Sequence, residues 1–194
     1  MKNHIMLDLE TLSVNPNAVI LQIGMCRFDP MTGDTGDEFE KTIDLDSSLR
    51  AGFDVDASTI QWWQHQEEKA RLSVFNGDMA IETAMWETRY FISECPHIWS
   101  HATFDFVLLM NHFRRFNIKP PSYRSAHDIR TLIELAGGLE NMKYPKVGTT
   151  HTALDDCKYQ VQYVSDLYRK IKRGNDEPFG HAVLGPESSQ DTRL

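Results

Sequence analysis

The sequence predicts an α/β fold, with a mixed sheet and helices on both of its faces. Three short, mostly apolar segments come first, and turn-forming residues lie between the last two, as in antiparallel neighbours. Beyond residue 56, apolar residues recur at helical spacing and short strands alternate with helices. Such alternation favours parallel strands whose connecting helices cover the two faces of a sheet.

The first three strands are expected over residues 4–9, 18–28 and 38–45. Residues 4–9 are short and apolar and run into acidic residues, which is typical of a buried strand. Residues 18–28 are largely apolar, and residues 38–45 alternate between polar and apolar side chains. The segment 29–36 (DPMTGDTG) is rich in turn residues. The three strands should therefore form a β-meander.

Helices and short strands are expected to alternate over the rest of the chain. Asp56 or Ser58 can cap a helix that includes Ile60, Trp62 and Trp63. The later elements are predicted as helix 79–94, strand 97–100, helix 105–117, strand 123–128, helix 129–136 and, after a glycine-containing loop, helix 152–172.

Length and composition indicate one globular domain followed by a tail. The chain has 194 residues, of which 41% are hydrophobic and 25% charged, and this excludes wholesale disorder. Residues 1–173 contain every predicted element and form the expected domain. Residues 174–194 are rich in Gly, Pro, Ser and charged residues, so they are expected to be a poorly ordered tail or a surface extension.

Charge and cysteine content narrow the function classes. A net charge of −8 argues against bulk attraction to nucleic-acid phosphates, although a metal site would itself collect carboxylates. Three cysteines without CxxC spacing fit reduced thiols. The N-terminal residues lack the apolar stretch of a signal peptide, and no segment resembles a membrane span. We expect a soluble, cytoplasmic protein that does not associate with membranes.

Asp8 and Glu10 are the first candidates for chemistry. Residues two apart on a strand point to the same side, so both carboxylates would face one spot at the end of an apolar strand. Hard divalent cations such as Mg²⁺ prefer carboxylate oxygens, and open α/β sheets bind ligands at strand ends. One D-x-E is also what chance would give in this composition, so the pair alone is a weak signal.

Two further acidic positions lie where helices are expected to begin. Asp105 would either cap its helix or bind a metal ion, and the two roles are compatible. His151 and Asp156 open the last helix, five residues apart, so they converge only if His151 precedes the helix. Asp155 is the rival ligand, and His151 could instead be a capping or surface residue. Four acids and one histidine match the needs of two-metal phosphoryl transfer with a general base.

Three motifs together resemble the DEDDh 3′→5′ exonucleases. LDLET (7–11) resembles their D-x-E-T motif, HATFDF (101–106) their N-A-x-F-D motif, and HTALDD (151–156) their H-x-A-x-x-D motif. STIQWW (58–63) and HDIRTL (127–132) further resemble the branch of phage exonuclease A and the mycobacterial exoribonuclease. The second motif usually carries Asn where this chain has His101, so the role of that residue is open.

The resemblance implies a ribonuclease-H-like fold with a five-stranded mixed sheet whose first three strands are antiparallel. It implies that two Mg²⁺ or Mn²⁺ ions are held by Asp8, Glu10, Asp105 and Asp156. It also implies that His151 is the general base and that Leu9 and Thr11 meet the terminal 3′ nucleotide. Related enzymes are often homodimers, so a homodimer is expected.

Aromatic side chains would suit a single strand that enters end-first, because bases stack on aromatic faces. Trp62, Trp63 and Phe104 are the candidates, although one of the adjacent tryptophans could pack into the core. Arg130 would contact a phosphate or form a surface salt bridge. The expected activity releases nucleoside 5′-monophosphates from single-stranded nucleic acid, with RNA favoured over DNA. The alternatives are a single-stranded DNA exonuclease and a domain that binds nucleic-acid ends without cutting.

Overall fold

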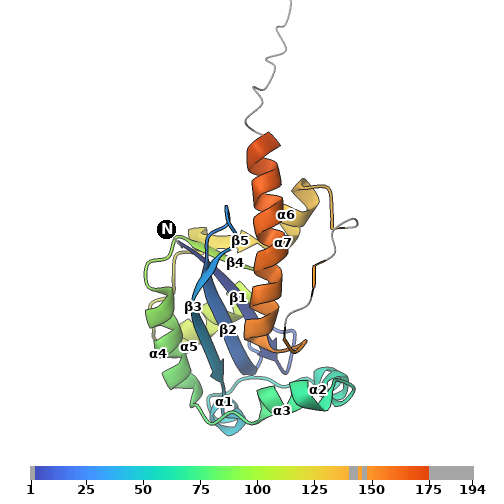
Figure 1. The fold of residues 1–194 in the computed structure, drawn as a ribbon. Coiled ribbons are helices and arrows are strands. Elements are labelled where there is room, and N and C mark those ends of the chain that lie inside the picture. The colour runs from blue at the N-terminus through green and yellow to red at the C-terminus, as the bar shows by residue number, and fades with distance from the viewer. Residues whose placement is uncertain (1–2, 140–143, 146–147, 175–194) are drawn as a thin grey trace, which may run out of the picture.

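The computed structural model describes residues 3–139, 144–145 and 148–174. Its strands form a single sheet in the order β3-β2-β1-β4-β5. They are β1 (His4–Thr11), β2 (Ile20–Phe28), β3 (Thr35–Thr42), β4 (His97–Ser100) and β5 (Ala126–Asp128). β1, β2 and β3 pair antiparallel, whereas β1–β4 and β4–β5 pair parallel. The predicted five-stranded mixed sheet is confirmed (Figure 1).

Helices cover both faces of the sheet, as the alternation of elements predicted (Figure 1). The helices of the described residues are α1 (Leu45–Arg50), α2 (Ala57–Gln64), α3 (Glu68–Phe75), α4 (Ile81–Ile92), α5 (Asp105–Arg115), α6 (Ile129–Leu135) and α7 (Ala153–Gly174). The long helix α7 crosses one face beside α6, and α4 and α5 lie on the other face. In the described part of the chain, no helix is both long and apolar enough to span a membrane.

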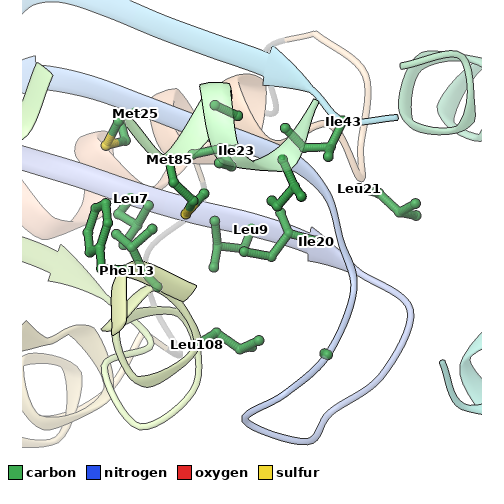
Figure 2. Close-up of a cluster of buried hydrophobic side chains, with 14 of the residues drawn as sticks. Leu7, Leu9, Ile20, Leu21, Ile23, Met25, Ile43, Met85, Leu108 and Phe113 are labelled. Atoms are coloured by element: carbon green, nitrogen blue, oxygen red, sulfur yellow. The ribbon is translucent and has the colours of Figure 1, made fainter. Parts of the chain in front are cut away.

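The alternation of side chains along β1 decides which residues meet α7. Ile5, Leu7 and Leu9 pack into the core shared with α4 and α5, and Figure 2 shows Leu7 and Leu9 in that cluster. Met6 belongs to the opposite core, with residues of α6 and α7. Because the strand period is two residues, Asp8 and Glu10 share the face of Met6. The apolar residues of β1 thus hold its two acids under the first turns of α7.

Gly24 on β2 lets α7 approach the sheet at this point. It pairs with Asp8 across the β1–β2 ladder. A Cβ atom on Gly24 would clash with the backbone of Ala153 and Leu154. Next to it, the Gln22 side-chain oxygen accepts a 2.8 Å hydrogen bond from the Ala153 N–H and so satisfies an amide at the start of the helix.

Gly24→Ala is expected to destabilise the fold strongly. The added methyl meets backbone atoms at the start of α7, which cannot swing aside as a flexible side chain would. Overpacking of this kind lowers the unfolding free energy by at least about 2 kcal/mol. Denaturant titration of the variant beside wild type measures the loss. An unchanged midpoint would contradict the close approach of α7 to β2.

Several element boundaries differ from the sequence-based expectations. The strand expected over 38–45 is β3 at Thr35–Thr42, so it begins inside the segment assigned to a turn. It ends early because the Asp44 carboxylate accepts hydrogen bonds from Asp46 N–H and Ser47 N–H and starts α1, which was not expected. Helix α3 was not expected either.

The last part of the chain shows two further differences. Most of the strand expected over 123–128 is a 3₁₀ turn at Tyr123–Ser125, which the Ser122 hydroxyl starts by accepting from the Arg124 N–H, and β5 follows. Helix α7 continues to Gly174, two residues beyond the expected end. The predicted tail, from residue 175 onward, lies outside the described residues.

Candidate active site

Four carboxylates from three distant segments gather at one end of the sheet, where the central strand β1 ends. Asp8 and Glu10 come from the end of β1, Asp105 is the first residue of α5, and Asp156 lies in the first turn of α7. The charges of Asp105, Glu10 and Asp156 all act on Asp8, and those of Asp156 and Asp105 act on Glu10. The parallel pairing of β4 with β1 helps to bring Asp105 beside the β1 acids, because α5 begins shortly after β4 ends.

The cluster is poorly suited to hold four negative charges by itself. Burial, together with the charges of its acidic neighbours, raises the pKa of Asp8 well above its ordinary value. Burial and the charges of Asp156 and Asp105 raise the pKa of Glu10 to about 8. Burial also raises the pKa of Asp105 to about 7, although backbone N–H groups stabilise its carboxylate. A divalent cation would relieve this repulsion, and oxygen-rich sites are what Mg²⁺ and Mn²⁺ prefer.

His151 completes the cluster because it precedes helix α7. Its backbone adopts the left-handed conformation, with φ of 62°, which is uncommon for a residue other than glycine. Ligand atoms of Glu10, His151 and Asp156 lie within 4.8 Å of one another. The structure therefore meets the condition that the five-residue spacing imposed, namely that the histidine lies ahead of the helix.

The neighbouring Asp155 points elsewhere. Its carboxylate accepts hydrogen bonds from the Thr149 N–H at 2.8 Å and the Thr152 hydroxyl at 3.1 Å, so it holds the residues that directly precede α7. The Asp156 carboxylate instead accepts from the His151 N–H at 3.1 Å. Of the two acids that the sequence left as rivals, Asp156 is the one that lies beside Glu10 and His151.

A turn after β4 positions Asp105. The Asp105 carboxylate accepts from the His101 N–H at 3.0 Å and also from the Leu9 N–H, so it does not serve as a simple helix cap. Asp128, at the end of β5, accepts from the Ala102 N–H at 3.0 Å and thereby fixes the same turn. Sequence reasoning placed Asp128 at a strand end but gave it no role, because its contact to Ala102 spans 26 residues.

His101 occupies the position where the related motif carries Asn. The residue is half-buried, and its Nδ1 has no hydrogen-bond partner among the described residues. Burial and the nearby Arg130 charge lower the pKa of His101. Its backbone, rather than its ring, makes the contact to Asp105.

An open pocket of about 450 Å³ lies beside the acids. Five of the six predicted substrate-binding residues line it, namely Leu9, Thr11, Trp62, Trp63 and Phe104. The rest of the lining is Glu10, Val14, Ser58 and Thr59. The Trp62 side chain is 44% exposed, and its ring lies edge-on to His151 with 4.9 Å between centroids. Arg130 does not line this pocket, but it is exposed on α6, and its positive charge offsets part of the rise that burial causes in the pKa of Asp105.

The two tryptophans of α2 differ in their surroundings. Trp63 is only 2% exposed, and its indole N–H donates a 2.9 Å hydrogen bond to the Thr11 carbonyl. The Thr11 hydroxyl is also engaged, since it donates to the Ser13 carbonyl at 2.8 Å. Trp62 therefore presents the larger aromatic surface to a ligand, and Trp63 mainly fixes the end of β1.

Comparison with known proteins identifies the family. A family model described as the 3′-5′ exoribonuclease Rv2179c-like domain matches residues 3–168. The chain belongs to this family. An exodeoxyribonuclease of Enterobacteria phage T4 is 23% identical to this chain over 210 aligned positions, which cover 83% of this chain and 90% of the phage protein.

Solved structures share the fold of this chain. E. coli exonuclease I in complex with a dT13 oligonucleotide matches with a TM-score of 0.63 and 13% identity, over 89% of this chain and 42% of that chain. Pop2p of S. pombe, in its Mg²⁺- and Mn²⁺-bound form, matches with a TM-score of 0.58 and 12% identity, over 87% and 85% of the two chains. This chain thus spans about two fifths of the length of the exonuclease I chains.

Family membership confirms two expectations from the motifs. The chain is a 3′-5′ exonuclease, and it has the ribonuclease-H-like fold of the exonucleases that it matches. Within the described residues, Glu10, His151 and Asp156 are the group with ligand atoms close enough to hold one metal ion. Asp8 and Asp105 lie beside that group, and their charges act on one another.

Proposed function

We propose that this chain removes nucleoside 5′-monophosphates from the 3′ end of single-stranded RNA with the help of two Mg²⁺ or Mn²⁺ ions. The observation that carries the proposal is the convergence of four buried or half-buried carboxylates with His151 at the end of the central strand β1. The donor set fits these ions, because it offers carboxylate oxygens in excess of what the protein itself neutralises. Divalent cations bound there would stabilise charge on the phosphate and on the attacking and leaving oxygens.

Each residue has a separate task in this proposal. Asp8, Glu10, Asp105 and Asp156 would hold the cations. His151 would accept the proton of the attacking water, for which its place at the rim of the acid cluster is suited. Leu9, Thr11 and Phe104 would surround the terminal nucleotide in the neighbouring pocket, and Arg130 would contact a phosphate.

RNA is the proposed substrate, and single-stranded DNA is the alternative. The description of the family as exoribonuclease supports RNA. The phage relative is an exodeoxyribonuclease, and exonuclease I was solved with a DNA oligonucleotide, which supports DNA. Competition between matched RNA and DNA oligonucleotides decides between them, since a site that reads the 2′-hydroxyl will prefer one.

Digestion of end-labelled oligonucleotides tests the activity. A 5′-labelled strand should give a ladder that shortens from its 3′ end, and a 3′-labelled strand should release labelled mononucleotide at once. EDTA should stop both reactions, and added Mg²⁺ or Mn²⁺ should restore them. Cleavage that ignores EDTA, or tight binding of the strand without hydrolysis, would contradict the proposal, and the latter would favour a non-catalytic end-binding domain.

Trp62→Ala and Trp63→Phe are expected to separate substrate binding from stability. Loss of a base-stacking ring at Trp62 should raise the KM for a single-stranded oligonucleotide roughly 10-fold or more, with little change in unfolding free energy. Trp63→Phe removes the hydrogen bond to Thr11 and should cost about 1 kcal/mol of stability. Steady-state kinetics and denaturant titration on both variants provide the measurements. Equal effects of the two changes on KM would contradict the distinction.

Three further proposals rest on the resemblance and on composition. We propose that the chain acts as a homodimer in the cytoplasm and that residues 1–173 form its single catalytic domain. The match of the family model to residues 3–168 supports the domain boundary. Sedimentation of the purified chain at micromolar concentration tests the dimer, and a monomeric mass would contradict it.

A further inference from the structure

Gln160 is a buried amide beside the acid cluster that none of the roles above uses. It lies on α7 one turn after Asp156, so the two side chains share a face of the helix. Its side chain is only 6% exposed. The amide N–H donates a 2.8 Å hydrogen bond to one carboxylate oxygen of Asp8, across 152 residues of sequence.

The other end of this amide is unsatisfied. The Gln160 Oε1 is buried and has no hydrogen-bond partner among the described residues. Buried side-chain acceptors in native proteins nearly always have a donor, and an exception calls for an explanation. The amide is bonded to Asp8, so this oxygen lies at the border of the acid cluster, where water around a bound cation would supply a donor.

The hydrogen bond from Gln160 holds Asp8 in place without cancelling its charge. It anchors one oxygen of a carboxylate that is buried among three acidic neighbours. Because an amide carries no net charge, it holds Asp8 without neutralising it, whereas a lysine or arginine would compete with a cation. One Asp8 oxygen is engaged by Gln160, which leaves the other oxygen to face a cation.

We propose that Gln160 is a positioning residue of the metal site: it fixes the Asp8 carboxylate in its metal-binding orientation and offers Oε1 to water around the bound cation. This inference rests on the proposed two-metal function. Outer residues that orient metal ligands typically change metal affinity or activity by roughly 10–100-fold when replaced.

Gln160→Met tests the proposal, with Gln162→Met as its matched control. The methionine keeps the length of the side chain and removes both hydrogen-bonding groups. Gln162 lies on the same helix, about 200° round the axis from Gln160, and its amide donates to the Pro145 carbonyl at 3.5 Å. Mn²⁺ binding is measured by calorimetry on the whole chain without nucleic acid. Gln160→Met should weaken Mn²⁺ roughly 10–100-fold, and saturating Mn²⁺ should restore most of kcat, while Gln162→Met should leave both unchanged.

Gln160→Lys provides a second measurement should the methionine variant fail to fold. Its ammonium would pair with Asp8, so the melting temperature of the metal-free chain should rise while Mn²⁺ affinity falls. Unchanged Mn²⁺ affinity in Gln160→Lys would contradict the placement of this residue at the metal site.

The outcomes distinguish this inference from the function on which it rests. Unchanged Mn²⁺ affinity in the Gln160 variants, with normal digestion by wild type, would overturn the role of Gln160 alone. Weakened Mn²⁺ binding in Gln160→Met, with a wild type that binds Mn²⁺ but cuts no nucleic acid, would support Gln160 and refute the nuclease proposal. A wild type that binds no Mn²⁺ would overturn both.

Discussion

Glu10→Gln is expected to abolish exonuclease turnover and, at the same time, to stabilise the metal-free protein at pH 8. The carboxylate is 8% exposed and faces Asp156 and Asp105, which together with burial raise its pKa to about 8. The amide removes one charge from this cluster while keeping its shape. Loss of a metal ligand should lower kcat at least about 10³-fold, since metal ions supply several kcal/mol of transition-state stabilisation.

The stability change has a sign that depends on pH. Glu10 binds its proton more tightly in the folded chain, where its pKa is about 8, than in the unfolded chain, where it is near 4.5. Its contribution to stability is therefore fully present below pH 4.5 and is lost as the pH rises through 8. Gln at this position avoids that loss, so the metal-free variant should be more stable at pH 8 by on the order of 2 kcal/mol, or roughly 5 °C in Tm.

Thermal melts in EDTA from pH 5 to 9 measure this effect. The wild-type melting temperature should fall across the range, and the Glu10→Gln curve should be flatter. At high pH, added Mg²⁺ should restore the melting temperature of the wild type but leave that of the variant unchanged. Glu82→Gln, at an exposed position in the first turn of α4, is the matched control and should change neither kcat nor the pH dependence. A Glu10→Gln protein that is active, or less stable than wild type at pH 8, would refute the acid-cluster description.

His151→Asn should lower kcat by roughly 10²–10⁴-fold, which is the usual contribution of a general base. Asparagine is chosen because it tolerates the left-handed backbone that His151 adopts, so the fold should persist. It cannot accept the proton of the attacking water. The KM should change far less than kcat, because the residue would act on water rather than on the bases.

Metal titration of the same variant separates two roles for His151. A general base leaves the Mn²⁺ dissociation constant near its wild-type value, whereas a ligand would weaken it in parallel with kcat. His65→Asn, at the exposed end of α2, is the control and should behave like wild type. Wild-type kcat in the His151 variant would remove this residue from the mechanism.

The fold was predictable to the extent that local patterns dictate it. Short apolar strands and the change to helical spacing gave the order of the main elements, and the family motifs gave the sheet. The end of β3 and the start of α1 were misplaced because a single carboxylate, that of Asp44, decides between strand and helix there. Helix α3 escaped prediction because its two buried residues, Ala70 and Val74, give it almost no amphipathic pattern.

The candidate site was also predictable only where local spacing determines it. The strand period placed Asp8 and Glu10 on one face, and the spacing of His151 and Asp156 required the histidine to precede the helix. Contacts between distant segments were not accessible from spacing, and they settle which of two adjacent acids or tryptophans faces the site. Gln160 illustrates this best, since its helical distance from Asp156 was visible in the sequence but its contact to Asp8 depends on how α7 crosses β1.

The central claim is that Asp8, Glu10, Asp105 and Asp156 bind a shared pair of divalent cations. Anomalous diffraction from crystals soaked in Mn²⁺ with a nucleoside 5′-monophosphate tests it most directly. We predict two manganese peaks between these four carboxylates, with His151 within reach of the phosphate. Peaks that lie elsewhere, or carboxylates that touch no common ion, would contradict the account.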